Sequence, residues 1–253
     1  MKIIVNNLAT EYKDEGEGPV VLMLHGWRRN ISDFDGITER LKNKYRIVRV
    51  DLPGFGGTEV PKDKIWNLND YVVFVKNFVE KINIKPYALL GHSFGGRIIL
   101  KNQFQAEKII LISSAGIIAK RWRKNIFMIL AKVGNFASYI PPLVFVRHKL
   151  KNKFYKAIGS DYLDSGHMKE IFKAVVEEDL SLDASKIKTP TLLIWGEKDR
   201  ITPLEDGLKL SQLIRNSKFE IIKDTGHFSH LEKAEEIIRL IEGFISPLNI
   251  RGD

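Results

Sequence analysis

One stretch, Gly91-His92-Ser93-Phe94-Gly95-Gly96, decides how the rest of this 253-residue chain is interpreted. It contains the pattern Gly-x-Ser-x-Gly, with an apolar run before it at residues 87–90 and an apolar-periodic segment after it. A strand, a sharp glycine-flanked turn and a helix would expose the Ser93 hydroxyl at the turn. The pattern by itself also fits a glycine-rich turn with an idle serine, so its weight depends on partners elsewhere in the chain.

A serine hydroxyl becomes a good nucleophile when an imidazole takes its proton and a carboxylate orients that imidazole. His227 follows the last apolar run of the chain, and Asp199 follows the run before it. Loops at the carboxyl ends of parallel strands share one edge of a sheet, so Ser93, Asp199 and His227 are expected to converge there. The chain order Ser, Asp, His matches one of the known triad orders. Asp224 is the alternative carboxylate.

Catalysis of this kind also needs backbone donors for a developing oxyanion. Leu24-His25-Gly26-Trp27 ends an early apolar run, and Gly26 allows the backbone there to approach the reaction centre. The expected donors are the N–H groups of Trp27 and Phe94. His25 is expected to hold this loop by hydrogen bonds, and His230 to lie at the surface or behind His227.

Short apolar runs alternate with helical patterns, which predicts βαβ units and a mostly parallel sheet covered on both faces. The predicted strands are residues 3–5, 20–24, 45–50, 87–90, 108–112, 191–195 and 219–222. The segment at residues 3–12 adds a pair of antiparallel edge strands. Predicted helix caps are Ser32 with Asp35, Asn67 or Asn69, and Thr202 before Pro203, and a last helix covers residues 234–245.

The alternation of predicted strands and helices stops between residues 117 and 185. We interpret this segment as a helical cap inserted into a core of residues 1–116 and 186–253. Helical stretches are predicted at residues 123–133 and 168–178. Apolar cap residues are expected to roof a substrate pocket with Phe228. The cap residues of this predicted pocket are Ile126, Phe127, Leu130, Phe136 and Tyr139.

Taken together, these motifs resemble the α/β-hydrolase superfamily, in its capped type that acts on small molecules. The matching stretches span most of the chain outside the insertion: His25-Gly26-Trp27, Asp51-Leu52-Pro53-Gly54-Phe55-Gly56, Gly91-His92-Ser93-Phe94-Gly95-Gly96, Gly196-Glu197-Lys198-Asp199 and Gly226-His227. The resemblance implies the α/β-hydrolase fold with an inserted helical cap, and a serine hydrolase without a cofactor.

The activity expected on this basis is cleavage of carboxylic esters of small or medium acyl chain through an acyl-enzyme, as in carboxylesterases. Two alternatives stay open. One is carbon–carbon bond cleavage of ring-fission products, although enzymes of that type usually have Gly-Pro-Gly after the first His-Gly, where this chain has Trp27-Arg28-Arg29. The other is a non-catalytic, ligand-binding homologue. A dinucleotide loop at residues 54–57 is disfavoured, because Pro61 stands where its helix should run.

The net charge of +9 is concentrated in the predicted cap. Ten of the 40 Lys and Arg residues fall between residues 117 and 160, which hold no Asp or Glu, leaving 30 basic and 31 acidic residues elsewhere, a net charge of −1. No nucleic-acid-binding motif accompanies them, so nucleic acid is not an expected partner. A solvated face is one interpretation, and peripheral contact with anionic surfaces is another. The ten are Lys120, Arg121, Arg123, Lys124, Lys132, Arg147, Lys149, Lys151, Lys153 and Lys156.

The remaining composition limits the class of protein. The chain has no cysteine, which excludes disulfides, a cysteine nucleophile and thiolate metal sites. The six histidines form no spaced pattern with carboxylates, so no metal site is expected. We expect a cytoplasmic location, since residues 1–12 lack a secretory h-region and no apolar run approaches 18 residues. The sequence gives no indication of the oligomeric state.

Overall fold

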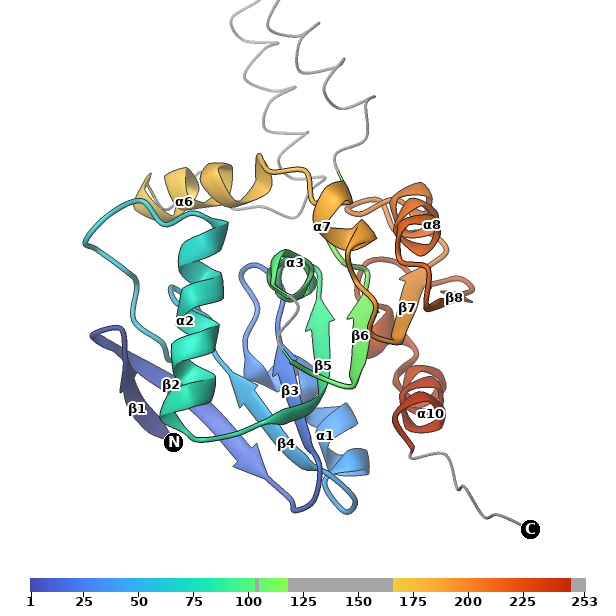
Figure 1. Ribbon diagram of the computed structural model, residues 1–253, viewed down its shortest axis with the longest axis horizontal. Coiled ribbons are helices and arrows are strands. Elements are labelled where there is room, and N and C mark those ends of the chain that lie inside the picture. Colours follow the sequence, from blue (N-terminus) through green and yellow to red (C-terminus); the bar gives the residue numbers. More distant parts are fainter. Residues whose placement is uncertain (103–104, 118–165, 247–253) are drawn as a thin grey trace, which may run out of the picture.

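Residues 1–102, 105–117 and 166–246 are described by the structure, a computed structural model (Figure 1). They build one eight-stranded sheet in the order β1-β2-β4-β3-β5-β6-β7-β8. Only β1–β2 and β2–β4 pair antiparallel, and the other neighbours pair parallel. The strands are β1 (Lys2–Val5), β2 (Leu8–Glu15), β3 (Val20–Leu24), β4 (Arg46–Val50), β5 (Pro86–His92), β6 (Lys108–Ile112), β7 (Thr191–Gly196) and β8 (Ser217–Ile222).

Helices cover both faces of the sheet, as the continuous apolar strands predict (Figure 1). In β3, Leu22 and Leu24 belong to the core that includes α2, α3 and α8, whereas Val21 and Met23 belong to the core on the other face with α1 and α10. The helices are η1 (Ile31–Phe34, a 3₁₀ turn), α1 (Asp35–Leu41), α2 (Leu68–Lys81), α3 (Phe94–Lys101), α6 (Gly166–Val176), α7 (Ser181–Ser185), α8 (Leu204–Leu213), α9 (Ser229–Glu232) and α10 (Ala234–Ile245).

Most helices and strands begin and end within one or two residues of the bounds that the sequence predicts. The predicted edge hairpin is confirmed, and Asn6 and Asn7 make its turn with positive φ values of 50° and 61°. Asn67 caps α2 as predicted, in a reciprocal capping box with Asp70. The bounds predicted for the last helix are those of α10.

Two predicted caps are wrong. Asn30, not Ser32, begins the first helical segment: its extended backbone lets the Asn30 Oδ1 accept a hydrogen bond from the Ser32 N–H at 2.9 Å. Thr202 does not cap α8, which begins at Leu204 with Pro203 in the capping position. The Thr202 side chain turns instead toward Asp199, because a charged acceptor attracts the hydroxyl more strongly than a helix N–H does.

The chain between the neighbouring strands β6 and β7 is a long connection, and α6 and α7 are its described helices. Arg97 of α3 is buried and donates from Nε to the Val175 carbonyl at 2.5 Å. His167 donates from Nε2 to the Pro61 carbonyl at 2.7 Å. The end of this connection is therefore attached to the core at two points. The exact limits of the cap, 117 and 185, stay a prediction.

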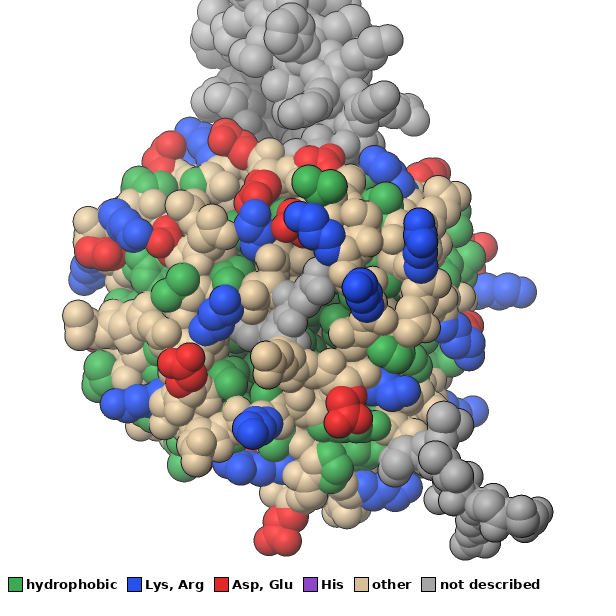
Figure 2. Space-filling model, in the orientation of Figure 1, with side chains coloured by type: hydrophobic (Ala, Val, Ile, Leu, Met, Phe, Trp, Pro, Cys, Tyr) green, Lys and Arg blue, Asp and Glu red, His purple; other side chains and the backbone are tan. Residues whose placement is uncertain are grey.

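The basic segment lies outside the described residues, apart from Ile117, so its role also stays a prediction. On the described part of the face in Figure 2, Lys and Arg side chains are scattered among Asp and Glu side chains. This agrees with the near-neutral charge of the chain outside residues 117–160. Within the described ranges, no helix is both long and apolar enough to cross a membrane.

Candidate active site

The sharp turn predicted around Ser93 lies between β5 and α3, and Ser93 has a strained backbone conformation there. Ser93 has φ 49° and ψ −106°, is partly exposed, and is the N-cap residue that precedes α3. The flanking glycines are required by close packing: a Cβ on Gly91 would lie 2.6 Å from the Gly96 nitrogen, and one on Gly95 would lie 2.0 Å from the Leu24 carbonyl oxygen. Strain at a position fixed by such packing is typical of a functional turn.

His227 and Asp199 form a buried pair at the carboxyl edge of the sheet. His227 lies after β8 and Asp199 after β7, and His227 Nδ1 donates to Asp199 Oδ2 at 2.8 Å. Asp199 Oδ1 accepts from the N–H groups of Ile201 (2.8 Å) and Thr202 (3.0 Å). Burial would raise the pKa of Asp199, but hydrogen bonds from His227 and Thr202 outweigh it and hold this pKa below its ordinary value. Asp199 is therefore ionised at neutral pH.

The competing carboxylate, Asp224, lies elsewhere. It is exposed, and it pairs with the Lys198 ammonium at 2.6 Å. Among the described residues, no hydrogen bond or ion pair joins its carboxylate to the His227 ring. Of the two carboxylates that the sequence offers, Asp199 is the one that the fold pairs with His227.

Ser93 and the His227 loop are joined through His92. The His92 Nε2 donates to the His227 carbonyl at 3.0 Å, and the two imidazole ring centroids are 4.9 Å apart. Gly26 packs closely against His92 and Ser93. A Cβ on Gly26 would lie 2.8 Å from His92 Nδ1 and 3.4 Å from the Ser93 Cβ. The loops that carry Gly26, Ser93 and His227 therefore lie together at one edge of the sheet.

The predicted oxyanion donors flank this point. Trp27 follows Gly26, and Phe94 is the first residue of α3, where a backbone N–H has no partner within the helix. Their rings are in contact, with centroids 5.2 Å apart. His25 holds the loop as expected, since Nδ1 donates to the Gly26 carbonyl (2.7 Å) and Nε2 accepts from the Leu52 N–H (2.9 Å).

The predicted pocket is only partly covered by the structure. Its five cap residues, Ile126, Phe127, Leu130, Phe136 and Tyr139, lie outside the described residues. Phe228 is half-buried, with its ring 5.2 Å from that of His227 and the Arg29 guanidinium 5.1 Å from its centroid. The sequence interpretation missed Phe55 and Phe172, whose rings lie 4.7 and 5.1 Å from Trp27. Phe55 was visible within a family motif, whereas Phe172 has no signal beyond helical periodicity.

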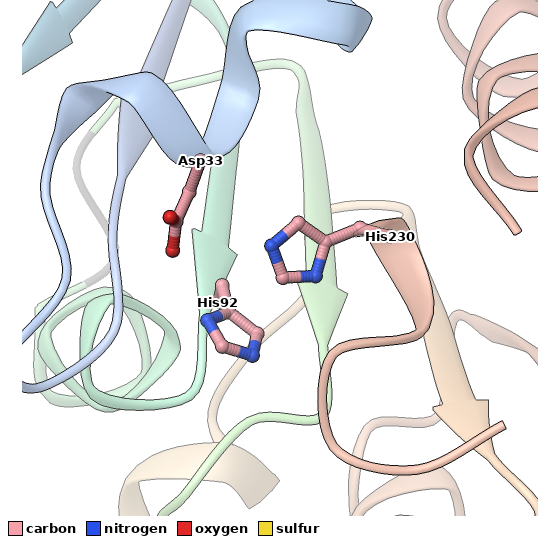
Figure 3. Close-up of side chains that lie close together, drawn as sticks. All are labelled: Asp33, His92 and His230. Carbon is pink, nitrogen blue, oxygen red and sulfur yellow. The ribbon is translucent and has the colours of Figure 1, made fainter. Parts of the chain in front are cut away.

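A buried cluster of Asp33, His92 and His230 was also missed, because its members come from η1, β5 and α9 (Figure 3). One nitrogen or oxygen of each lies within 4.8 Å of the others. The alternative that His230 lies at the surface is wrong, since it is 2% exposed and its ring lies 4.4 Å from that of His92. Both Asp33 oxygens already accept from Arg29, at 2.5 and 2.6 Å. A divalent cation would therefore meet a carboxylate whose charge is already compensated, and we assign no metal here.

Burial of His230 predicts a specific dependence of stability on pH. Burial lowers the pKa of His230 from the ordinary 6.5 to about 4. Between these values the unfolded chain binds a proton that the folded chain rejects, so the stability present above pH 6.5 is lost as the pH falls toward 4. From pH 7 to pH 5 this group removes roughly 2 kcal/mol from the free energy of unfolding.

The His230→Phe variant has no proton to bind, so its free energy of unfolding should fall by roughly 2 kcal/mol less over that range. Urea unfolding at pH 7 and pH 5 measures the difference, and comparing each protein with itself removes any change in packing. Equal losses in the two proteins would show that His230 is not held neutral by the fold.

The family of this chain follows from its sequence as well as its architecture. The profile of the alpha/beta hydrolase family matches residues 21–240. The chain belongs to this family.

Individual relatives fall into more than one activity class. The chain is 30% identical to the uncharacterized hydrolase YugF of Bacillus subtilis, over 95% of this chain and 94% of the relative. It is 26% identical to monoacylglycerol lipase abhd6-B of Xenopus laevis (92% and 77% covered). It is also 26% identical to 2-hydroxymuconate semialdehyde hydrolase of Pseudomonas putida (97% and 93% covered).

Solved structures agree on the fold. An esterase from Exiguobacterium antarcticum aligns with a TM-score of 0.74 at 22% identity, covering 96% of this chain and 98% of the esterase. A meta-cleavage product hydrolase from Pseudomonas fluorescens IP01 aligns with a TM-score of 0.72 at 20% identity, covering 96% of each chain. At these identities the likeness extends to the fold and not to the substrate.

Proposed function

We propose that this protein is a serine hydrolase that cleaves carboxylic esters of small or medium acyl chain. The observation that carries the proposal is the buried His227–Asp199 pair at 2.8 Å, beside the strained Ser93 turn. A buried imidazole hydrogen-bonded to an ionised carboxylate is the arrangement that activates a serine hydroxyl. The monoacylglycerol lipase among the relatives supports ester chemistry.

In the proposed reaction, Ser93 Oγ attacks the ester carbonyl while His227 accepts the hydroxyl proton. Asp199 orients the imidazole and stabilises its cationic form. The N–H groups of Trp27 and Phe94 bind the oxyanion of the tetrahedral intermediate. The intermediate collapses to an acyl-enzyme as His227 returns the proton to the departing alkoxide, and water then releases the acid by the same steps.

Carbon–carbon bond cleavage is a second candidate, favoured by the Pseudomonas putida relative named 2-hydroxymuconate semialdehyde hydrolase. The same serine, imidazole and carboxylate would serve it. Both classes occur among the relatives and structural neighbours, so the choice between them depends on the substrate.

A direct comparison of substrates tests the proposal. Turnover of p-nitrophenyl esters with graded acyl chains is measured beside turnover of 2-hydroxymuconate semialdehyde. We expect ester hydrolysis with the highest kcat/KM at short or medium chains. A much higher kcat/KM for the semialdehyde would favour the second candidate, and no turnover of either would favour a ligand-binding role.

The proposed base predicts a single rising limb in the pH profile of ester hydrolysis. Only a neutral imidazole accepts the Ser93 proton, so kcat/KM should rise along a single limb as the pH increases. Nearby groups should not contribute, because burial lowers the pKa of His92 well below its ordinary value and that of His230 to about 4. A profile that is flat from pH 5 to 9, with chemistry limiting the rate, would count against an imidazole base.

A further inference from the structure

The Thr202 hydroxyl lies where the Asp199–His227 pair meets the end of β6. Its Oγ1 is 2.9 Å from Asp199 Oδ2, 3.2 Å from His227 Nδ1 and 3.1 Å from the Ser113 carbonyl oxygen. Thr202 is 7% exposed. One buried hydroxyl therefore contacts both members of the pair, although the sequence pattern around it predicts only a helix cap.

The single proton of the Thr202 hydroxyl has two possible acceptors. It has one hydrogen to donate, and both Asp199 Oδ2 and the Ser113 carbonyl can only accept. A hydrogen bond to an ionised acceptor is stronger than one to a neutral carbonyl, so the proton goes to Asp199. The lone pairs of Thr202 Oγ1 then face the His227 Nδ1–H, which donates mainly to Asp199 at 2.8 Å.

Thr202 holds both oxygens of the same carboxylate. Its backbone N–H donates to Asp199 Oδ1 at 3.0 Å, and its hydroxyl donates to Asp199 Oδ2. These two bonds fix the rotation of the carboxylate so that Oδ2 is presented to the imidazole. The Ile201 N–H adds a second bond on Oδ1 at 2.8 Å. Within the described part of the chain, Thr202 is the other side-chain donor to Oδ2, the oxygen that meets His227.

We propose that Thr202 is a positioning residue, whose hydroxyl sets the orientation and basicity of the Asp199–His227 pair. The inference rests on the proposed function, since it concerns the same proton transfer from Ser93. Thr202 acts through Asp199 and His227 and not by touching the substrate. Its donated proton offsets part of the negative charge on Oδ2, which moderates how strongly the carboxylate stabilises the imidazolium.

A purely structural role is the competing explanation. The third contact of the hydroxyl, with the Ser113 carbonyl, joins the end of β6 to the turn before α8, and Ser113 itself has a positive φ of 45°. If that contact were its whole function, loss of the hydroxyl would lower stability without changing the proton transfer. The test therefore needs measurements that a change in stability alone would not alter, such as the pH profile of catalysis and the NMR signal of the His227 ring proton.

The Thr202→Val variant keeps the branched shape and removes the hydroxyl. With p-nitrophenyl butyrate, kcat should fall about 10- to 100-fold, the range for losing one hydrogen bond to a charged group, while KM stays nearly constant. The midpoint of the kcat/KM profile should move to higher pH, because the uncompensated carboxylate favours the imidazolium. Thr202→Ser, which restores the hydroxyl, should recover both values. Thr202→Ala provides a second test if the valine variant folds poorly.

Thr225→Val is the matched control. Thr225 is also a buried threonine, 1% exposed, and lies two residues before His227, but its hydroxyl donates to the Ile222 carbonyl at 2.9 Å. We expect its kcat and pH midpoint to match those of the parent protein. Among the residues that the structure describes, the other ionisable groups around the pair are His92, His230 and Asp206, and all three are retained in both variants.

A measurement without substrate completes the test. The proton on His227 Nδ1 gives a low-field ¹H NMR signal, which should shift in Thr202→Val and return in Thr202→Ser. If Thr202→Val keeps kcat within about two-fold with the same midpoint and the same NMR signal, the inference is wrong. A lower melting temperature as the only change would establish the structural role instead. If Ser93→Ala retains ester turnover, the proposed function itself has failed, which is a different result from either.

Discussion

Replacing Ser93 with alanine should lower ester turnover by on the order of 10⁵- to 10⁶-fold. The Ser93 Oγ is the atom proposed to form the covalent bond to the acyl group. The serine lies in a turn that accepts alanine, because the two side chains share a Cβ and the close contacts of the turn involve its glycines. Folding should therefore survive, and circular dichroism with a melting curve checks this.

A variant that lacks both Ser93 and His227 tests whether the two residues act together or contribute separately to catalysis. If Ser93 and His227 act in one proton transfer, Ser93→Ala with His227→Ala should be little worse than either change alone. The residual rate would come from binding and from the backbone donors. Substantial turnover in Ser93→Ala, after contaminating esterase is excluded with an irreversible serine reagent, would mean that the hydrolysis takes place elsewhere.

The position of Ser93 could be predicted because its signal is local. A strand, a glycine-flanked turn and a helix occupy residues 86–101, and nothing beyond that window is needed to place the hydroxyl at a sheet edge. The convergence of Asp199 and His227 followed from one rule about parallel sheets, without any knowledge of side-chain geometry. Local pattern and sheet topology together were sufficient for this part of the site.

The other contacts depend on tertiary packing that no window of sequence contains. Thr202 precedes a proline and a helix, so its local pattern favours a cap, yet the Asp199 carboxylate attracts its hydroxyl. His230 carries a polar side chain that usually lies near the surface, but the loop after β8 turns it onto His92 and Phe34. Such residues were mispredicted because the competing interaction comes from a distant segment.

The carboxylate is the point at which the sequence alone leaves a real choice. Asp199 and Asp224 each follow a strand, at the same edge of the sheet. The structure gives them opposite surroundings: Asp199 is 6% exposed and bonded to His227, whereas Asp224 is exposed and paired with Lys198. This contrast makes the two aspartates a matched pair for mutation.

Changing Asp199 to asparagine should lower kcat for ester hydrolysis by about 10⁴-fold. The amide can donate to His227 Nδ1, which would place the imidazole proton on Nε2 and leave no lone pair there for the Ser93 proton. Asp224→Asn removes the same charge from the neighbouring loop, and should leave kcat within about two-fold because it breaks only an exposed ion pair. Steady-state kinetics of the two variants, measured side by side above pH 7, compare them directly. The reverse order of effects would transfer the orienting role to Asp224, and it would require the His227 loop to turn away from the hydrogen bond at 2.8 Å that it makes with Asp199.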